Sequence, residues 1–207
     1  QVLRRGIGDE LVVVDGEGGW YRVRIQYAKK DKLIAEVLEK QRDVGEPEVR
    51  LTIGLALLKS TDRYEWFLEK AVELGVTAIV PLLTQHTEMR RFRPDRAQKV
   101  MIAALKQSGR SRLPCLHQPT NFQDQLTLQA DFRAVLHEKT MEPSLFSRTR
   151  GEKIAHTMIL VGPEGGFSEE EIQQAEAHGW LMASLGERRL RAETAAVVAA
   201  GLGLVSV

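Results

Sequence analysis

The chain has 207 residues, a formal net charge of +1 and a single cysteine. Its length and its 43% hydrophobic content suffice for one good core and a small second one, which argues against extensive disorder. One cysteine excludes a disulfide framework or a cysteine cluster for zinc, and the five histidines show no metal-ligand spacing. No apolar run approaches the ~20 residues of a membrane helix. We therefore expect a cytoplasmic protein without a metal site or a membrane contact.

Residues 1–46 are expected to form a small β domain. Two strand-like runs, 11–14 and 20–25, flank a glycine-rich connection in the pattern of a hairpin, and an alternating run follows at 32–40. These few strands predict a β-barrel-like fold. The chain opens within what reads as an element, so we expect this domain to be truncated at its N-terminus. A linker is expected at 43–49, where Gly45 and Pro47 act as breakers.

The second domain, residues 47–207, shows strands that alternate with helices. Strands are expected at 51–58, 77–83, 132–138, 157–162 and 181–186, and helices at about 62–74, 94–109, 168–178 and 193–205. This alternation is typical of an α/β fold with a mostly parallel sheet covered on both faces. Ligands of such sheets bind beyond the carboxyl ends of the strands. Three loops fall there, at 137–139, 162–167 and 186–194.

The stretch "LVGPEGGFSEEEI", residues 160–172, has the outline of a ligand-binding turn before a helix. It lacks the spacing, the lysine and the hydroxyl of a phosphate loop, and Glu164 would repel a triphosphate. Ser168 and Glu171 match a capping box, so the acidic first turn is expected to stabilise the helix. Gly165 and Gly166 instead allow a backbone to approach a ligand closely. The alternative is a tight turn with a surface glutamate.

A second signal is "LGERRLRAETAAVVAAGLG", residues 185–203. A short basic loop leads into a helix whose first turns carry small side chains, which allows close packing against a flat ligand or against another segment. An apolar contact, a cation, a carboxylate and a hydroxyl fall within five positions, at Leu190, Arg191, Glu193 and Thr194. Taken alone, the pattern is equally compatible with a helix cap and surface charges.

Arginines are clustered at 90–96, 110–112 and 188–191. Such clusters bind nucleic acid by neutralising phosphates, and solvated surface charge is the alternative.

Four stretches together carry a resemblance to a known family: "DRYEWFLEKAVELGVTAIVPLLTQHT", "QSGR", "VGPEGGFSEEEI" and "LGERRLRAETAA". The chain resembles, over nearly its whole length, the 16S ribosomal RNA uridine-N3 methyltransferases of the RsmE type, within the SPOUT superfamily. The resemblance implies a PUA-like RNA-binding domain at 1–46 and a trefoil-knotted SPOUT α/β methyltransferase domain at 47–207. It also implies a homodimer that uses S-adenosylmethionine to methylate N3 of a specific uridine in 16S rRNA of the small ribosomal subunit.

Two alternatives remain open at this point. One is a SPOUT methyltransferase that acts on another RNA such as tRNA, because cofactor motifs are shared more widely than substrate motifs. The other is a non-catalytic RNA-binding factor of ribosome assembly.

The resemblance and the chemistry of methyl transfer together predict the site residues. Arg191 is expected to stabilise negative charge on the uracil, and Glu193 to act as general base or to orient Arg191; a simple pairing of the two is the alternative. RNA phosphates are expected at Arg90, Arg91, Arg93, Arg110 and Arg112. The cofactor positions that the resemblance implies are Leu136, His137, Glu138, Gly162, Pro163, Glu164, Gly165, Leu185, Gly186, Leu190, Arg191, Thr194 and Ala195.

The chain departs from the family pattern in two places. Residues 84–87 read "TQHT" where the family usually reads "TERS", and Lys106 replaces a frequent glutamate before "QSGR". Both lie outside the cofactor motifs, so we expect them to affect RNA contacts more than methyl transfer.

Overall fold

The computed structural model describes residues 6–29, 32–89, 91–138, 140 and 154–205. The chain divides into two compact units. The N-terminal unit comprises Gln1–Glu46 and Leu105–Leu113, and the C-terminal unit comprises Pro47–Ala104 and Pro114–Val207. The segment 105–113, expected within the second domain, thus groups with the N-terminal unit in this division.

The described part of the N-terminal unit is built on an antiparallel sheet of three strands in the order β1-β2-β3. The strands are β1 (Glu10–Val14), β2 (Gly19–Lys29) and β3 (Lys32–Arg42). The glycine-rich connection predicted between the first two strands is a tight turn, because the Asp15 carboxylate accepts hydrogen bonds from the backbone N–H groups of Glu17 and Gly19. Because β1 and β2 also pair antiparallel, the predicted hairpin is confirmed.

Ion pairs and hydrogen bonds join the segment 105–113 to the turn that follows β3. Arg110 is buried, and its guanidinium lies 2.6 Å from the carboxylate of Glu46. The other oxygen of Glu46 accepts hydrogen bonds from the backbone N–H groups of Ser111 and Arg112, at 3.0 and 2.8 Å. Arg112 also pairs with Asp43 at 2.6 Å, and this hydrogen bond lowers the pKa of the Asp43 carboxyl. Oppositely charged side chains therefore join residues 43–46 to residues 110–112, which are distant in sequence.

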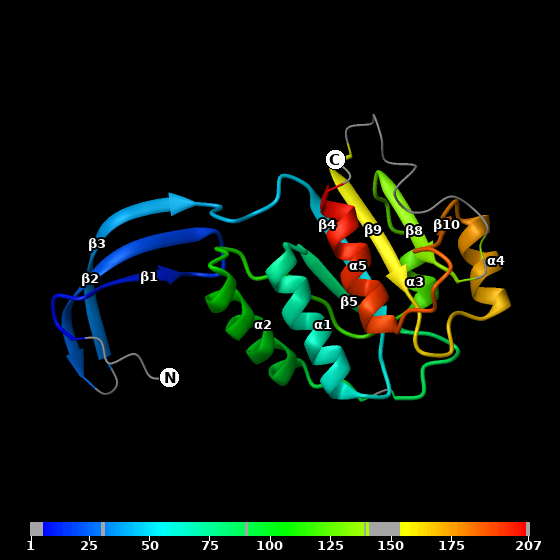
Figure 1. Ribbon diagram of the computed structural model, residues 1–207, viewed down its shortest axis with the longest axis horizontal. Helices are drawn as coiled ribbons and strands as arrows, with labels where there is room; N and C mark the ends of the chain where they lie inside the picture. Colours follow the sequence, from blue (N-terminus) through cyan, green and yellow to red (C-terminus); the bar gives the residue numbers. More distant parts are fainter. Residues whose placement is uncertain (1–5, 30–31, 90, 139, 141–153, 206–207) are drawn as a thin grey trace. The chain divides into compact units, whose positions relative to one another are not determined.

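The C-terminal unit contains a parallel sheet in the order β10-β8-β9-β4-β5-β6, with β7 paired to β5 (Figure 1). Its strands are β4 (Arg50–Ala56), β5 (Ala78–Leu83), β6 (Cys115–Leu116), β7 (Thr120–Asn121), β8 (Phe132–Leu136), β9 (His156–Val161) and β10 (Leu181–Ala183). The predicted mostly parallel α/β sheet is confirmed. The trefoil knot stays a prediction.

Helices cover both faces of this sheet. The described helices are α1 (Thr61–Leu74), α2 (Pro94–Ser108), α3 (Phe122–Leu126), α4 (Glu169–Ala177) and α5 (Ala192–Val205). Of these, α5 contacts β4 and β9 on one face, and α3 and α4 pack on the core at the other. Successive side chains of a strand point to opposite faces. In β9, Met158 and Leu160 accordingly pack with α3 and α4, whereas Ile159 lies beneath Gly203 of α5.

The helix ends follow the capping signals in the sequence. Ser60 caps α1, and Gly75 ends it in a left-handed conformation with φ of 112°. Ser168 and Glu171 form the predicted capping box of α4, with both reciprocal hydrogen bonds present. The capping box agrees with the expectation that the acidic residues in the first turn of α4 stabilise the helix.

The differences from the predicted elements concern short or terminal stretches. β6, β7 and α3 were not predicted, because elements of two to five residues carry too little periodicity. β10 ends at Ala183 instead of residue 186, since the chain leaves the sheet there.

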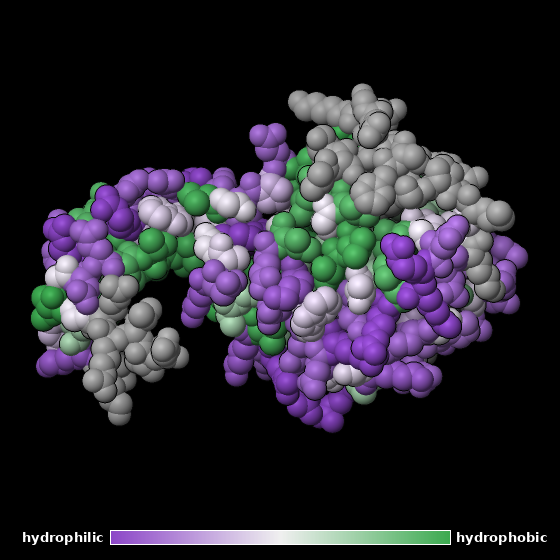
Figure 2. Space-filling model, in the orientation of Figure 1, coloured by the Kyte–Doolittle hydropathy of each residue, from purple (hydrophilic) through white to green (hydrophobic). Residues whose placement is uncertain are grey.

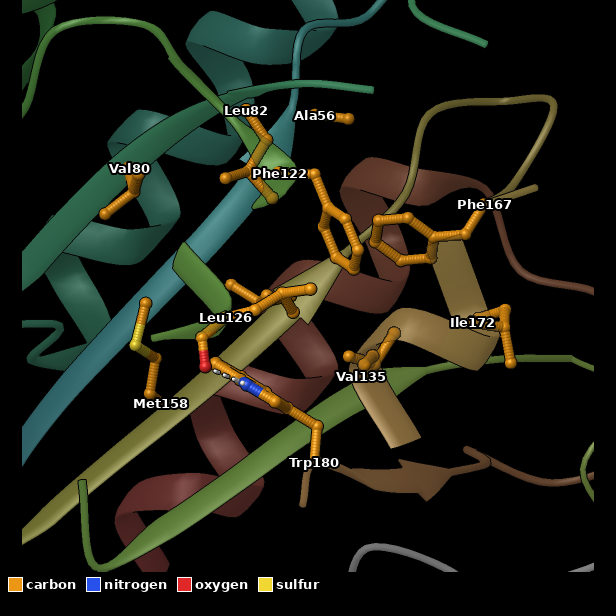
Figure 3. Packing of buried hydrophobic residues seen from close by; sticks show 12 residues of the cluster. Ala56, Val80, Leu82, Phe122, Leu126, Val135, Met158, Phe167, Ile172 and Trp180 are labelled. Atoms are coloured by element: carbon orange, nitrogen blue, oxygen red, sulfur yellow. Dashed lines mark hydrogen bonds between the residues drawn. The ribbon is translucent and has the colours of Figure 1, made fainter. Parts of the chain in front are cut away.

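The hydrophobic core beneath α3 and α4 reaches the end of β9 (Figure 3). The rings of Phe122 and Phe167 lie 4.8 Å apart between centroids, and the indole N–H of Trp180 donates to the carbonyl of Leu126 at 3.1 Å. Phe167 is the residue directly before the helix cap of α4. The core therefore holds the chain at the point where the glycine-rich stretch ends.

Candidate functional site

A cleft of about 760 Å³ lies at the carboxyl ends of β8, β9 and β10. We call it the main cleft; its volume falls within the ~300–1,000 Å³ typical of small-molecule sites. The lining residues are 136–138, 161–169, 183–186 and 188–192, together with His86, Ile172 and Ala195. The three loops predicted to meet at this edge of the sheet do meet there, with Lys139 outside the described residues.

The structure brings most of the predicted site residues together. Every predicted cofactor position lines the main cleft except Thr194. Arg191 lines it as well, but Glu193 does not. Two of the lining residues that the sequence did not single out, Ile172 and Ala183, are apolar neighbours of the predicted positions and carry no chemical signature in a single sequence, whereas His86 comes from a distant segment.

The first wall is the glycine loop, residues 162–167. The N–H of Gly166 donates to the carbonyl of Pro163 at 2.9 Å, and Gly166 has φ of 70°, which favours glycine. A Cβ atom on Gly162 would lie 3.1 Å from the carbonyl carbon of Gly166 and 3.2 Å from the backbone nitrogen of Phe167. Glycine is therefore favoured at 162, because the loop folds back on its own backbone and an added methyl group would force it to shift.

Side chains and backbone groups outside the glycine loop also hold it. Glu164 accepts a hydrogen bond from the backbone N–H of Lys59 at 3.2 Å. Nδ1 of His86 lies 3.2 Å from the carbonyl oxygens of Gly165 and Gly166, and it must carry the proton in these bonds because carbonyls only accept. These contacts fix the loop before any ligand arrives.

The segment 84–87 therefore has a role that the sequence did not predict. Besides His86, the backbone N–H of Gln85 donates to buried Glu171 at 2.9 Å, and the hydroxyls of Thr84 and Thr87 lie 2.9 Å apart. The departure "TQHT" thus borders the main cleft. It contacts the glycine loop, where the resemblance implies cofactor positions, and the expected effect on RNA contacts stays a prediction.

The second wall is the basic loop, residues 184–190. Its Ser184 hydroxyl and Gly186 form a local turn, and Gly186 has φ of 103°. Arg189 lies 3.6 Å from Glu138, but both side chains are largely exposed, so this ion pair contributes little. The arginines of this wall are available to an anionic partner.

Arg191 and Glu193 lie in different environments. Arg191 is exposed in the main cleft. Glu193 is 5% exposed and lies 3.7 Å from Arg63 of α1, while its Oε2 has no hydrogen-bond partner among the described residues. No ion pair between Arg191 and Glu193 occurs in the described structure. Arg63 was missed because its partner lies 130 positions away in sequence, which follows from the two residue numbers.

The arginines expected to hold RNA also separate into groups. Arg90 lies outside the described residues. Arg91 and Arg93 are exposed and line a smaller cleft. Arg110 is buried against Glu46, and Arg112 is half exposed beside Asp43. Arg110 therefore acts as a structural side chain within the N-terminal unit, and a phosphate contact would have to replace an ion pair.

The chemistry of the main cleft fits the cofactor that the sequence predicts. Leu136, Val161 and Leu190 supply apolar surface for a flat heteroaromatic ring. Backbone groups of the glycine loop and the carboxylates of Glu138 and Glu164 suit a ligand with donors and a cation. Within the described ranges, no group of three or more His, Cys, Asp or Glu side chains is placed to hold a metal. None of the described helices has the length and apolar character needed to cross a membrane.

Comparisons with known proteins agree with this geometry. A family model described as an RNA methyltransferase domain matches residues 45–203, and one described as an RNA methyltransferase PUA domain matches residues 1–38. The chain is similar to the ribosomal RNA small subunit methyltransferase E of Mesomycoplasma hyopneumoniae, with 33% identity over 79% of this chain and 73% of the relative. It is also similar to the protein of that name from Synechocystis, with 31% identity over 96% of this chain and 67% of the relative.

Solved structures show the same similarity in three dimensions. A ribosomal RNA small subunit methyltransferase E from Neisseria gonorrhoeae, bound to S-adenosylmethionine, superposes with a TM-score of 0.88 at 30% identity, over 96% of this chain and 84% of that one. A methyltransferase from Legionella pneumophila in complex with the same cofactor superposes with a TM-score of 0.86 at 28% identity, over 97% and 84% of the two chains.

Proposed function

Because the chain belongs to the RNA methyltransferase family, with a match to that family's PUA domain at residues 1–38, we propose that it methylates N3 of a uridine in 16S rRNA of the small ribosomal subunit. S-adenosylmethionine is the methyl donor, as in the similar enzyme from Neisseria gonorrhoeae. Ribosomal RNA of the small subunit is the substrate named for the relatives. The choice of uridine N3 rests on the sequence motifs of the main cleft.

The main cleft carries the proposal, because its walls match the parts of the donor. The glycine loop and residues 136–138 hold the cofactor through backbone groups and through the carboxylates of Glu138 and Glu164. Apolar contacts from Leu136 and Leu190 enclose its ring. When bound, S-adenosylmethionine supplies an electrophilic methyl group on a positively charged sulfur. Because the glycine loop is fixed in advance, little ordering cost is incurred on binding.

Arg191 is the proposed catalytic residue. Methylation at N3 requires the imide proton to leave, which places negative charge on the uracil ring and its oxygens. The exposed guanidinium of Arg191 lines the same cleft as Arg188 and Arg189, which supports the proposal that it stabilises that charge. The target base is normally hidden by pairing, so the uridine must be unpaired or flipped out to reach Arg191.

Glu193 fits a positioning role better than a base role. Its buried carboxylate is turned toward Arg63 and lies outside the lining of the main cleft. Glu193 lies in the first turn of α5, two residues after Arg191. Its ion pair with Arg63 joins this turn to α1. We therefore assign Glu193 to holding the backbone that presents Arg191.

The homodimer is part of the same proposal. α5 is composed almost entirely of apolar and small residues, and Val198 remains 37% exposed on it. Trp66 of α1, against which α5 packs, is 43% exposed. Figure 2 shows hydrophobic surface where Figure 1 places α5. Apolar surface of this kind favours association with a second copy.

The decisive experiment is mass spectrometry of nucleosides from small-subunit rRNA of a strain that lacks the gene. We expect N3-methyluridine to disappear and to return when the wild-type gene is supplied. Retention of N3-methyluridine in 16S rRNA, with loss of a modification from tRNA, would favour a different RNA substrate. No change in any methylated nucleoside would favour a non-catalytic assembly factor.

Variants of Arg191 test the mechanism. In Arg191→Ala, kcat is expected to fall by about 10²–10³, as is typical when a group that stabilises developing charge is removed. Arg191→Lys keeps the charge but loses the planar fork, so we expect a smaller loss. Cofactor affinity, measured by calorimetry, should change much less than kcat. Unchanged turnover in Arg191→Ala would remove this residue from the mechanism.

A further inference from the structure

A second cleft, of about 280 Å³, lies in the C-terminal unit between the start of α1 and residues 89 and 91–97. We call it the α1 cleft. Its lining residues are Leu57, Leu58, Thr61, Tyr64, Glu65, Leu68, Met89, Arg91, Phe92, Arg93, Arg96 and Ala97. The volume is at or below the lower limit of ~300 Å³ for drug-sized ligands, so the α1 cleft suits one flat group.

The inner surface of the α1 cleft is apolar and aromatic. Leu57, Leu58 and Leu68 are buried. The rings of Tyr64 and Phe92 meet edge to face, with centroids 5.9 Å apart and planes at 76°. The hydroxyl of Tyr64 donates inward to the carbonyl of Leu55 at 3.4 Å, so it is already satisfied. A ligand in the α1 cleft therefore meets ring and aliphatic carbon.

The rim of the α1 cleft is cationic. Arg96 is engaged with Glu65 at 2.5 Å and lies 3.8 Å from Asp62. Arg91 and Arg93 are exposed, and no described acidic side chain forms an ion pair with either of them. Two guanidinium groups are thus free to meet anions directly beside an apolar pocket.

The α1 cleft and the main cleft are neighbours along the chain. Leu57 and Leu58, which line the α1 cleft, directly follow β4. The next residue, Lys59, donates its backbone N–H to Glu164 of the main cleft. The short stretch 57–59 therefore connects the wall of the α1 cleft to the glycine loop of the main cleft.

We propose that the α1 cleft binds the base of an unpaired RNA nucleotide that flanks the methylated one, while Arg91 and Arg93 contact the adjoining phosphates. Apolar and aromatic walls accept any base through its flat face, and cations beside them follow the backbone, which is the combination used for single-stranded RNA. Paired bases are stacked inside a duplex and cannot enter. The identity of the polymer rests on the proposed function, but the chemistry of the cleft does not.

The test uses fluorescence anisotropy with two labelled probes of about 12 nucleotides, a length within the ~4–16-nucleotide sites of single-strand binders. One probe is oligouridylate, and the other is the same ribose-phosphate chain without bases. Thr61→Trp fills the α1 cleft from its exposed edge, and Phe92→Ala removes the aromatic wall. Lys99→Ala, an exposed α2 residue that does not line the cleft, is the matched control. Thermal unfolding verifies that each variant is folded.

We expect both cleft variants to weaken binding of oligouridylate by about 5- to 100-fold, the range found when base stacking is removed. Their affinity for the abasic probe and their salt dependence should match the wild type. Arg91→Ala with Arg93→Ala should instead weaken both probes and reduce the slope of log K against log salt by about 1.4, two phosphates at ~0.7 each. Lys99→Ala should resemble the wild type.

Several results would overturn the proposal. They are equal affinity of the wild type for both probes, binding to neither probe, or unchanged oligouridylate binding in both folded cleft variants. A shift in oligomeric mass of Thr61→Trp with unchanged RNA affinity would reassign the cleft to a second copy of the chain. Calorimetry with S-adenosylmethionine separates the two proposals. If the wild type does not bind the cofactor, the methyltransferase function is refuted. The probe results would still show whether the α1 cleft binds a base.

Discussion

The glycine loop and the basic loop line the same cleft but are built in opposite ways. The glycine loop is anchored in the core by Phe167 and held from outside by His86 and by the backbone of Lys59. The basic loop has a local turn at Ser184 and an exposed ion pair at Arg189. A fixed wall suits a cofactor that has the same shape at every turnover. An exposed cationic wall suits an RNA that must arrive and leave.

The largest effect is expected from removing the anchor of the glycine loop. Phe167→Ala should lower the free energy of unfolding by about 3–5 kcal/mol, because a buried aromatic ring that packs on Phe122 is lost. Urea unfolding measures this change. In the basic loop, Leu190→Ala should cost clearly less, since Leu190 is only half-buried. Equal losses in the two variants would contradict the contrast between the loops.

Gly162→Ala is expected to be next in size. The added methyl group meets backbone atoms at 3.1–3.2 Å, so the loop must shift, at a cost of about 1–3 kcal/mol. Affinity for S-adenosylmethionine, measured by calorimetry, should fall by roughly tenfold or more for the same reason.

Gly201→Ala is the matched control for this substitution. Gly201 lies in α5 with nothing within 4 Å of an added Cβ. It should raise the free energy of unfolding by about 0.5–1 kcal/mol, because alanine is the better helix former. Opposite signs for the two glycine variants would sharpen the comparison, and equal signs would break it.

A smaller effect is expected at the junction between the glycine loop and α4. Ser168→Ala removes the hydroxyl that caps α4 by accepting a hydrogen bond from the backbone N–H of Glu171. This substitution should lower the free energy of unfolding by about 1 kcal/mol. Ser184→Ala in the basic loop removes only a local exposed turn, for which we expect less than about 0.5 kcal/mol. Thermal unfolding of the two serine variants tests whether the glycine loop contributes more to stability than the basic loop does.

The smallest effect concerns the amino edge of the sheet, which belongs to neither loop. Burial, followed by the charge of Arg50, lowers the pKa of His156, and hydrogen bonds from the backbone N–H groups of His156 and Ala155 lower the pKa of Asp131. The folded state thus favours neutral His156. Its contribution to stability is complete above the unfolded pKa of ~6.5 and is lost as pH falls through the lowered folded value.

Urea unfolding between about pH 7 and pH 5 measures this loss, and His156→Gln should flatten it. The contribution of Asp131 follows the same sign at lower pH: it is present above ~3.9 and disappears as pH falls through the depressed folded value. A pH profile of the His156→Gln variant that matched the wild type would show that another group dominates this range.

Local signals in the sequence predicted the regular elements of the C-terminal unit closely. The capping box at Ser168 and Glu171 and the stop at Gly75 depend on contacts within a few residues, so they can be recognised without the fold. The alternation of predicted strands and helices predicted the parallel sheet. It also predicted that three loops would meet at one edge, because all parallel strands end on the same side.

The sequence by itself determined the longer regular elements and the glycine loop, since these depend on neighbouring residues, and it predicted which loops line the main cleft. Only the tertiary structure decided which side chains are free to act. Among the arginines expected to hold RNA, Arg110 is buried against Glu46 whereas Arg93 is exposed beside an apolar cleft. Glu193 faces Arg63 instead of Arg191. These assignments depend on residues far apart in the chain, because burial and pairing are properties of the packed molecule.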